Sequence, residues 1–254
     1  MKGKILKRVL AASLVLTFVS GTVPAQPIAD IFGSMSITAN AANGSLSGDG
    51  SQENPFLIED ADDWTTFAES INNGTTFSNQ YIKLINNITI TEMTGDATHP
   101  FSGTLDGDGY TITFNSDSST DGCAPFYQID GATFINLTVA GTINSSSTRS
   151  AGVAAYANGS STFSRCRSKI NINPTKRGAC FHAGFVSDAY SNSAYISFVD
   201  SIFEGSVSGT SSNYNICGFV AKDNQNYVTF SNCLFNPTSM NSGGNGCNPF
   251  SMNA

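Results

Sequence analysis

Charged side chains and histidines are scarce in this 254-residue chain. Lysine and arginine number 12 against 19 aspartate and glutamate residues, which gives a net charge of −7. An acidic, weakly charged chain is poorly suited to binding nucleic acid or an anionic membrane surface. The two histidines, His99 and His182, lie far apart in the sequence, and no zinc-type Cys/His spacing, H-E-x-x-H or G-x-S-x-G motif occurs. The sequence therefore offers no known catalytic motif.

Long hydrophobic runs are missing after the first 25 residues. The one apolar run, VLAASLVLTFV at 9–19, follows four basic residues and is too short to span a bilayer. This arrangement is typical of a secretory signal, with cleavage predicted after Ala25 or after Ala41. We therefore expect residues 1–41 to be a signal peptide and export region. The mature protein is expected to be secreted or held at the cell surface, without a membrane span.

Helical periodicity is restricted to one segment, residues 60–72. Its apolar residues recur at the i, i+3, i+4 and i+7 positions of one helical face: Trp64, Phe67, Ala68 and Ile71. Asp60 is placed to cap the first turn, and Gly74 follows the last one. No later segment has this period, which excludes an α-solenoid.

One short phrase returns five times after residue 120. It reads CAPFYQ at 123–128, AGVAAY at 151–156, HAGFVS at 182–187, CGFVAK at 217–222 and CNPFSM at 247–252. Successive copies are 27 to 34 residues apart when they are aligned on Phe126, Val153, Phe185, Phe219 and Phe250. A period of this length indicates a repeat architecture, in which each unit buries its core against its neighbours.

A second phrase lies within each repeat: TFINL, TFSRC, SFVDS and TFSNC. It aligns Phe134, Phe163, Phe198 and Phe230, and it also aligns Leu137, Cys166, Ser201 and Cys233 three residues later. A spacing of three between inward positions breaks strand alternation and predicts a corner, where Asn136 and Asn232 tolerate a left-handed backbone. Two or three short strands per repeat then give an all-β parallel β-helix with the four phenylalanines stacked in one column.

This pattern divides the chain into three parts. Residues 1–41 are the export region, residues 42–100 form an N-terminal cap with the first strands, and residues 101–254 form the β-helix repeats. The helix at 60–72 is expected to cover the unpaired edge of the first coil. The last repeat begins but is not completed, so the C-terminal end looks incomplete and is a candidate for end-to-end contact with a partner.

The residues resemble those of bacterial surface proteins with Gly-Leu-hydrophobic-Gly (GLUG) repeats. The resemblance is carried by NPFLIEDADDWTTFAESIN, YIKLINNITI and FSGTLDGDGYTI in that order, and by the later AGVAAY, AGFVSD and CGFVAK. It implies a right-handed, single-stranded parallel β-helix of the pectate-lyase-like type on an exported protein, often used in adhesion or surface display. It implies no catalytic residues.

The six cysteines leave their oxidation state open. Cys166 and Cys233 occupy equivalent places two coils apart, about 9–10 Å, which is beyond the reach of a disulfide. They are predicted to be small buried side chains in a ladder. Cys180 and Cys217, on neighbouring repeats, remain the candidates for a disulfide.

Five of the basic residues cluster in one short stretch: Arg165, Arg167, Lys169, Lys176 and Arg177. Strand alternation points Arg167 and Lys169 outward, where they would hold an anionic glycan. The alternative is pairing across coils, because Asp200 aligns with Arg165 and Glu204 aligns with Lys169.

Four tyrosines form a second set of candidate binding residues: Tyr190, Tyr195, Tyr214 and Tyr227. Beside serine and asparagine they would stack on sugar rings, or they would simply finish the corners of the solenoid. Asp106 and Asp108 in DGDG are interpreted as a turn, with a Ca²⁺ site as the weaker alternative. No other cofactor is expected.

These features predict an exported, non-catalytic cell-surface β-helix that acts in adhesion. It would bind a glycan or a host or cell-surface protein by many shallow contacts, and so by multivalency. Two alternatives remain open, a polysaccharide lyase or glycoside hydrolase on the same fold and a structural spacer, because the fold alone does not fix the activity.

Overall fold

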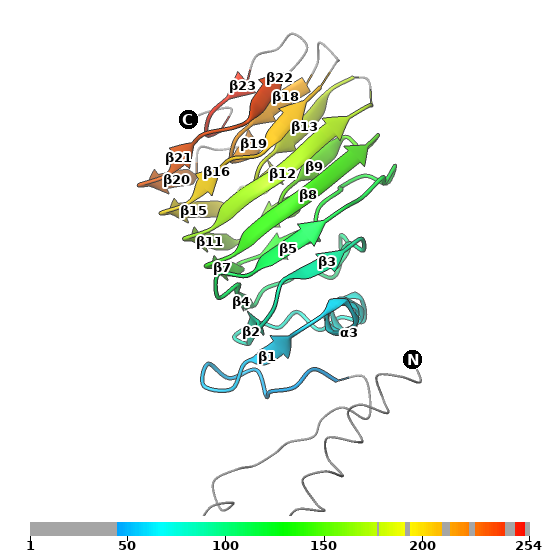
Figure 1. Ribbon diagram of the computed structural model, residues 1–254, viewed down its shortest axis with the longest axis vertical. Coiled ribbons are helices and arrows are strands. Elements are labelled where there is room, and N and C mark those ends of the chain that lie inside the picture. The colour runs from blue at the N-terminus through cyan, green and yellow to red at the C-terminus, as the bar shows by residue number, and fades with distance from the viewer. Residues whose placement is uncertain are drawn as a thin grey trace, which may run out of the picture. The chain divides into compact units, whose positions relative to one another are not determined.

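The computed structural model describes residues 45–176, 178–190, 194–209, 214–223, 227–241 and 247–251 (Figure 1). The predicted signal region therefore lies outside the described residues. The described chain is an all-β parallel β-solenoid with one short helix near its N-terminal end, as the repeats predict. Neighbouring strands of every sheet pair in parallel, one coil upon the next.

The chain coils through four sheets, which we name A, B, C and D; sheets A and B begin with the first coils, whereas sheet C begins at Phe126 and sheet D at Arg149. Sheet A contains β1 (Phe56–Ile58), β2 (Tyr81–Leu84), β4 (Thr104–Asp106), β7 (Thr133–Ile135), β11 (Ser160–Ser164), β15 (Tyr195–Val199) and β20 (Val228–Ser231). Sheet B contains β3 (Ile88–Ile90), β5 (Thr111–Phe114), β8 (Thr138–Ser145), β12 (Arg167–Pro174), β16 (Ile202–Phe203), β17 (Ser206–Ser208), β21 (Leu234–Phe235) and β22 (Ser239–Asn241).

The recurring phrase forms the other two sheets. Sheet C contains β6 (Phe126–Asp130), β10 (Ala154–Asn158), β14 (Val186–Ala189) and β19 (Val220–Asp223). Sheet D contains β9 (Arg149–Ala151), β13 (Cys180–Ala183), β18 (Tyr214–Cys217) and β23 (Cys247–Asn248). The expectation of two or three strands per repeat was too low, because the phrase itself turns a corner and supplies two strands.

The four predicted phenylalanines stack in one column inside the tube. The ring centroids of Phe134 and Phe163 are 5.0 Å apart, those of Phe163 and Phe198 are 4.8 Å apart, and those of Phe198 and Phe230 are 5.4 Å apart. The planes of successive rings differ by 13° at most. The column is therefore confirmed, and it sets the register of sheet A.

A second aromatic column faces the first one. Phe185 stacks on Phe219 at 5.0 Å, and Phe185 meets Phe163 and Phe198 edge to face at 5.9 and 5.3 Å. Offset and edge-to-face pairs of this kind stabilise a core beyond the burial of their area. The two columns together form the centre of the hydrophobic core.

The corner after sheet A has a left-handed backbone in four successive coils. Asn136 and Asn232 have φ angles of 51° and 53°, as their residue type predicts, and Arg165 and Asp200 adopt 53° and 51° at the same place. Asn232 Nδ2 donates to Asp200 Oδ1 at 2.6 Å, and Asn136 Nδ2 donates to Asp106 Oδ1 at 3.1 Å. Side-chain hydrogen bonds between coils thus stabilise the corner.

Glycine is required at the corner between sheets D and C. A Cβ atom added to Gly152, Gly184 or Gly218 would lie less than 3 Å from a backbone carbonyl oxygen of the following coil. The backbones of successive coils approach too closely there for any side chain. The phrase keeps this glycine in its three central copies for that reason.

Helix α3 (Ala61–Asn72) covers the N-terminal end of the core, as predicted. The Asp60 carboxylate accepts hydrogen bonds from the backbone N–H groups of Asp62 and Asp63 and caps the helix. The ring of Trp64 meets Phe126 of β6 at 5.6 Å, and Phe67 meets Phe101 at the same distance. The apolar face of the helix therefore packs on the first coil (Figure 1).

All six cysteines are free thiols. The proposed Cys180–Cys217 disulfide is wrong, because the parallel register pairs Cys180 with Tyr214 and pairs Cys217 with Ala183. Burial raises the pKa of Cys166 and Cys217 to about 12. These thiols are small buried side chains in the ladders, as predicted for Cys166.

We predict that Phe163→Ala costs about 3–5 kcal/mol of unfolding free energy, because it removes a fully buried ring from the middle of the column. Urea denaturation measures the loss. Ser164→Ala, on the outer side of the same strand, is the matched control and should change stability by less than about 0.5 kcal/mol. Equal losses in the two variants would contradict the central role of the column.

Candidate functional site

The outer side of sheet A carries a row of hydroxyl groups. Each central phenylalanine points inward, so the residue before it points outward. The parallel register aligns five such residues, one in each of five successive strands: Thr104, Thr133, Thr162, Ser197 and Thr229. We call this row the hydroxyl ladder.

The hydroxyl ladder lies on an uncharged surface. Strands β7, β11, β15 and β20 contain no acidic or basic side chain. None of the five ladder hydroxyls takes part in a side-chain hydrogen bond with another described residue, whereas many other hydroxyls bond to carbonyl oxygens, such as that of Ser187 to Phe181 at 2.8 Å. The ladder therefore presents donors and acceptors that the fold does not use.

Tyr195 and Tyr227 stand beside the ladder on the same face. Their side chains are among the more exposed large ones, at 49% and 37%, and their ring centroids are 4.4 Å apart. Tyr195 pairs in register with Ser160 of the coil before it. Because serine is short, the tyrosines rise above their neighbour and leave a recess next to them.

A groove of about 320 Å³ occupies this recess. It is lined by the two tyrosines, Ile196, Ser160 and Ser161, and by three ladder residues, Thr162, Ser197 and Thr229. Aromatic rings with adjacent hydroxyls match the chemistry of a sugar, which has an apolar C–H face and many hydroxyl groups. We call this the tyrosine groove.

The other two predicted tyrosines do not line this groove. Tyr190 is 41% exposed and meets the ring of Tyr156 edge to face at 5.7 Å. Tyr214 begins β18, and its side chain lies outside the described residues. The row of four tyrosines expected from the sequence is therefore a pair on sheet A, with a third residue elsewhere.

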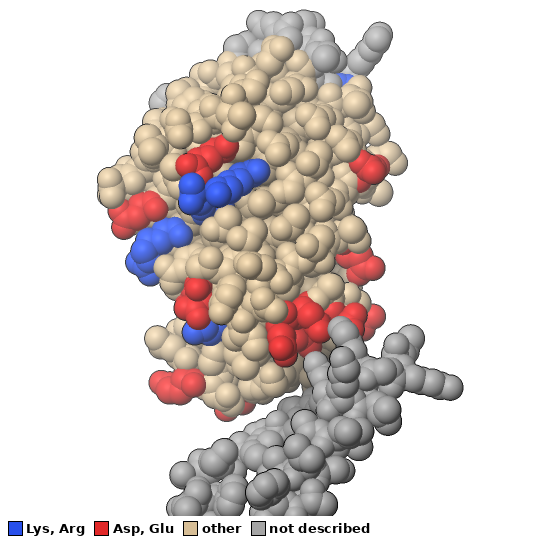
Figure 2. Space-filling view, viewed as in Figure 1, with Lys and Arg blue, Asp and Glu red and all other residues tan. Residues whose placement is uncertain are grey.

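The basic stretch begins at the corner after sheet A and continues along sheet B, where Arg167 is paired with an acidic residue. Arg167 Nε donates to Glu204 Oε2, and this bond lowers the pKa of Glu204. The expected partner of Glu204 was Lys169, which instead lines a separate groove of about 390 Å³ with Asn171 and Glu204. Figure 2 shows basic side chains of this face next to acidic ones.

Arg165 bonds to an amide side chain of a neighbouring coil rather than to an acidic residue. Arg165 Nε donates to Asn136 Oδ1 at 2.7 Å, and Asp200 accepts from Asn232, so the expected Arg165–Asp200 pair is replaced by bonds to other coils. Arg177 lies outside the described residues. The surface is thus mixed in charge and is less suited to an anionic glycan than the sequence indicates.

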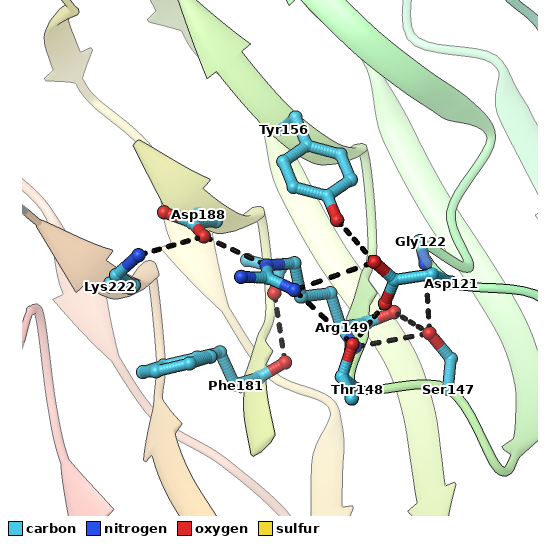
Figure 3. A network of polar contacts seen from close by, with 10 residues as sticks. Asp121, Gly122, Ser147, Thr148, Arg149, Tyr156, Phe181, Asp188 and Lys222 are labelled. Atoms are coloured by element: carbon cyan, nitrogen blue, oxygen red, sulfur yellow. Dashed lines mark hydrogen bonds and ion pairs between the residues drawn. The ribbon is translucent and has the colours of Figure 1, made fainter. Parts of the chain in front are cut away.

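A polar network lies on the outside of sheets C and D (Figure 3). Asp188 is fully buried and accepts from Arg149 Nε at 2.8 Å and from Lys222 Nζ at 3.3 Å. Asp121 accepts from the hydroxyl groups of Thr148 and Tyr156, the latter at 2.7 Å. Acidic and basic groups alternate across successive coils.

This network covers a crease between the two sheets. Small side chains are buried on the outer side of the sheets beneath it: Ala124, Ala151, Ala155, Ala183, Cys217 and Ala221. The guanidinium of Arg149 lies 5.1 Å from the ring centroid of Tyr156 and 5.6 Å from that of Phe181. Burial and the bond to Asp121 raise the pKa of Tyr156, so this phenol stays protonated and cannot act as a base. The network acts as a clamp between coils.

Asp106 and Asp108 form the predicted turn. Asp106 Oδ1 accepts from the backbone N–H of Asp108 at 2.9 Å, and Asp108 has a φ angle of 49° and pairs with Lys83 at 3.0 Å. Across the described ranges no group of three His, Cys, Asp or Glu side chains is arranged to hold a metal ion.

His182 is buried on the core side of sheet D, between Ser150 and Ile216 in the register. Burial lowers its pKa from 6.5 to about 3, so the folded protein holds it neutral.

This buried histidine predicts acid sensitivity. Between pH 6.5 and 3 the unfolded chain binds a proton at His182 that the folded chain does not, so stability falls as the pH decreases. We predict that lowering the pH from 7 to 5 costs the wild type about 2 kcal/mol more unfolding free energy than it costs His182→Ile. Urea denaturation at both pH values measures this. An equal loss in the two proteins would refute the assignment.

Comparison with known proteins does not place the chain in a family. No family model and no curated protein matches the chain. A solved structure from Bacteroides ovatus, of a protein provisionally named an immunoglobulin A1 protease, is similar over 82% of this chain and 87% of that one, with 13% identity and a TM-score of 0.44. Similarity at this level carries no inference about function. No described helix has the length and hydropathy that a membrane span requires.

The hydroxyl ladder was missed at the level of sequence, although its signal was present. The phrases TFINL, TFSRC, SFVDS and TFSNC begin with threonine or serine directly before the phenylalanine. The sequence prediction used the inward phenylalanine of each phrase and not the outward residue before it. An aligned inward column implies an aligned outward one, since both belong to the same strands.

Proposed function

We propose that this protein is an exported, non-catalytic cell-surface β-solenoid that binds uncharged glycans at the tyrosine groove. The observation that carries the proposal is the exposed pair of Tyr195 and Tyr227 beside hydroxyl groups that form no side-chain hydrogen bond with another described residue. Aromatic rings stack on the apolar faces of sugars, and hydroxyl groups exchange hydrogen bonds with their rims.

The charge of the face supports an uncharged ligand. The strands that form the groove, β11, β15 and β20, contain no acidic or basic residue. The nearest basic candidate on sheet B, Arg167, is paired with Glu204. An anionic glycan would thus find no cation among the groove residues to offset the burial of its charge, whereas a neutral one needs only hydrogen bonds for its hydroxyls.

Export and surface location are supported by the predicted signal peptide and by the composition of the mature chain. Shallow contacts of this kind give weak individual affinity, so repeated engagement on a cell surface would supply the avidity. A host or cell-surface protein that carries such glycans is then the natural partner. A polysaccharide-degrading enzyme and a plain spacer are the outcomes against which the proposal is tested.

We predict that Tyr195→Ala and Tyr227→Ala each weaken binding to neutral polysaccharides by about tenfold, which corresponds to about 1.4 kcal/mol. Affinity electrophoresis in gels containing xylan, galactomannan or β-glucan measures the effect. The double variant Arg167→Ser with Lys169→Ser is the matched control and should bind as the wild type does.

Three results would contradict the proposal. Release of reducing or unsaturated sugar ends during incubation would indicate an enzyme. Failure to bind any polysaccharide of the panel, or binding restricted to anionic ones such as hyaluronan and lost in the control variant, would remove the tyrosine groove as the site.

A further inference from the structure

The hydroxyl ladder extends well beyond the tyrosine groove. The groove contains only its last three members, Thr162, Ser197 and Thr229. Thr133 and Thr104 continue the same row toward the N-terminal end, with the same parallel register and the same lack of side-chain hydrogen bonds. In register, the residue of β2 next to Thr104 is Tyr81, so the row is followed at its N-terminal end by an aromatic side chain.

We propose that an extended, neutral, β-linked polysaccharide lies on sheet A along the solenoid axis, with about one sugar for each coil. This inference rests on the proposed function and specifies the ligand of that site. Sugars at one end would pack against the wall formed by Tyr195 and Tyr227. The following sugars would bond to the hydroxyls of Thr162, Thr133 and Thr104.

The spacing of the ladder supports this orientation. Neighbouring parallel strands are about 4.8 Å apart, so successive ladder hydroxyls repeat at that interval along the axis. An extended β-linked pyranose chain advances by a similar length for each sugar, so each sugar would lie opposite one coil. Successive sugars of such a chain are turned over, and each would meet the ladder hydroxyl of its coil with a different edge. A coiled α-linked chain does not keep that period over several sugars.

The surroundings of the ladder define where the chain would lie. Next to it, on the same outer face, run Ile135, Ser164, Val199 and Ser231, which are short or apolar and carry no charge. Charged side chains begin at the N-terminal end, where Asp106 and Lys83 take that position in β4 and β2. The uncharged track thus covers the coils from β7 to β20 and ends near Thr104.

The test is a length series. Isothermal titration with β-1,4-linked gluco-, xylo- or manno-oligosaccharides of one to six sugars should show affinity that rises about twofold to tenfold with each added sugar, up to four or five sugars, and then stays constant. Thr133→Val, which removes one ladder hydroxyl and keeps the side-chain shape, should weaken binding of the hexasaccharide and leave that of the disaccharide unchanged. Thr113→Val on sheet B is the matched control and should have no effect.

The outcomes separate this inference from the proposed function. Affinity that does not depend on length, together with loss of binding in Tyr195→Ala, would overturn the extended site and leave the tyrosine groove in place. A Thr133→Val variant that binds the hexasaccharide as well as the wild type does would also overturn it. Failure of every oligosaccharide and polysaccharide to bind would refute both.

Discussion

Registration of each coil on the one before it is the constraint on which the rest of this molecule depends. Parallel backbone hydrogen bonds fix which residues are neighbours, and the stacked rings of Phe134, Phe163, Phe198 and Phe230 fix that register against slippage. A shift of one residue would move every ring to the outside and bring polar groups into the core. The same constraint requires glycine where sheets D and C meet and tolerates left-handed residues such as Arg165 where sheet A ends. Packing and backbone geometry therefore select one alignment together.

That alignment also determines what the outside of the tube can do. When the rings of successive coils form an inward column, the residues before them form an outward column. Core packing and the chemistry of the outer surface are therefore determined by adjacent positions of the sequence. Such a surface can bind a ligand without a deep cavity, because its aligned side chains repeat along the solenoid axis and each makes a modest contact with the ligand. Binding by such a surface gains from length and from repetition more than from depth. The short Ser160 is followed, on the next two coils, by Tyr195 and Tyr227. Their rings form a wall at one end of the uncharged surface.

Much of the fold could be predicted because its determinants are local and periodic. The helix at 61–72, the phenylalanine column and the asparagine corners follow from spacing and residue type alone. The extra corner at Gly152 could not be read, since it depends on how closely two backbones approach. The pairing of Cys180 with Tyr214 depends on loop lengths that shift the register between coils. For the site, exposure of Tyr195 was predictable from its neighbours, whereas the departure of Tyr190 toward Tyr156 and the diagonal pairing of Arg167 with Glu204 are set by side-chain direction across coils.

The distribution of charge completes this picture. Several charged groups hold coils together from outside: Arg149 and Lys222 on Asp188 over the crease, and Arg167 on Glu204 over sheet B. The crease needs this clamp because its alanine floor buries little area per residue, while a buried Asp188 without both cations would be costly. In sheet A, Lys83 pairs with Asp108 near the N-terminal end, whereas β7, β11, β15 and β20 contain no charged residue and are stabilised on their inner side by stacked rings. The outer face of these four strands is thus where the exposed tyrosines lie, beside hydroxyls that form no side-chain hydrogen bond with another described residue.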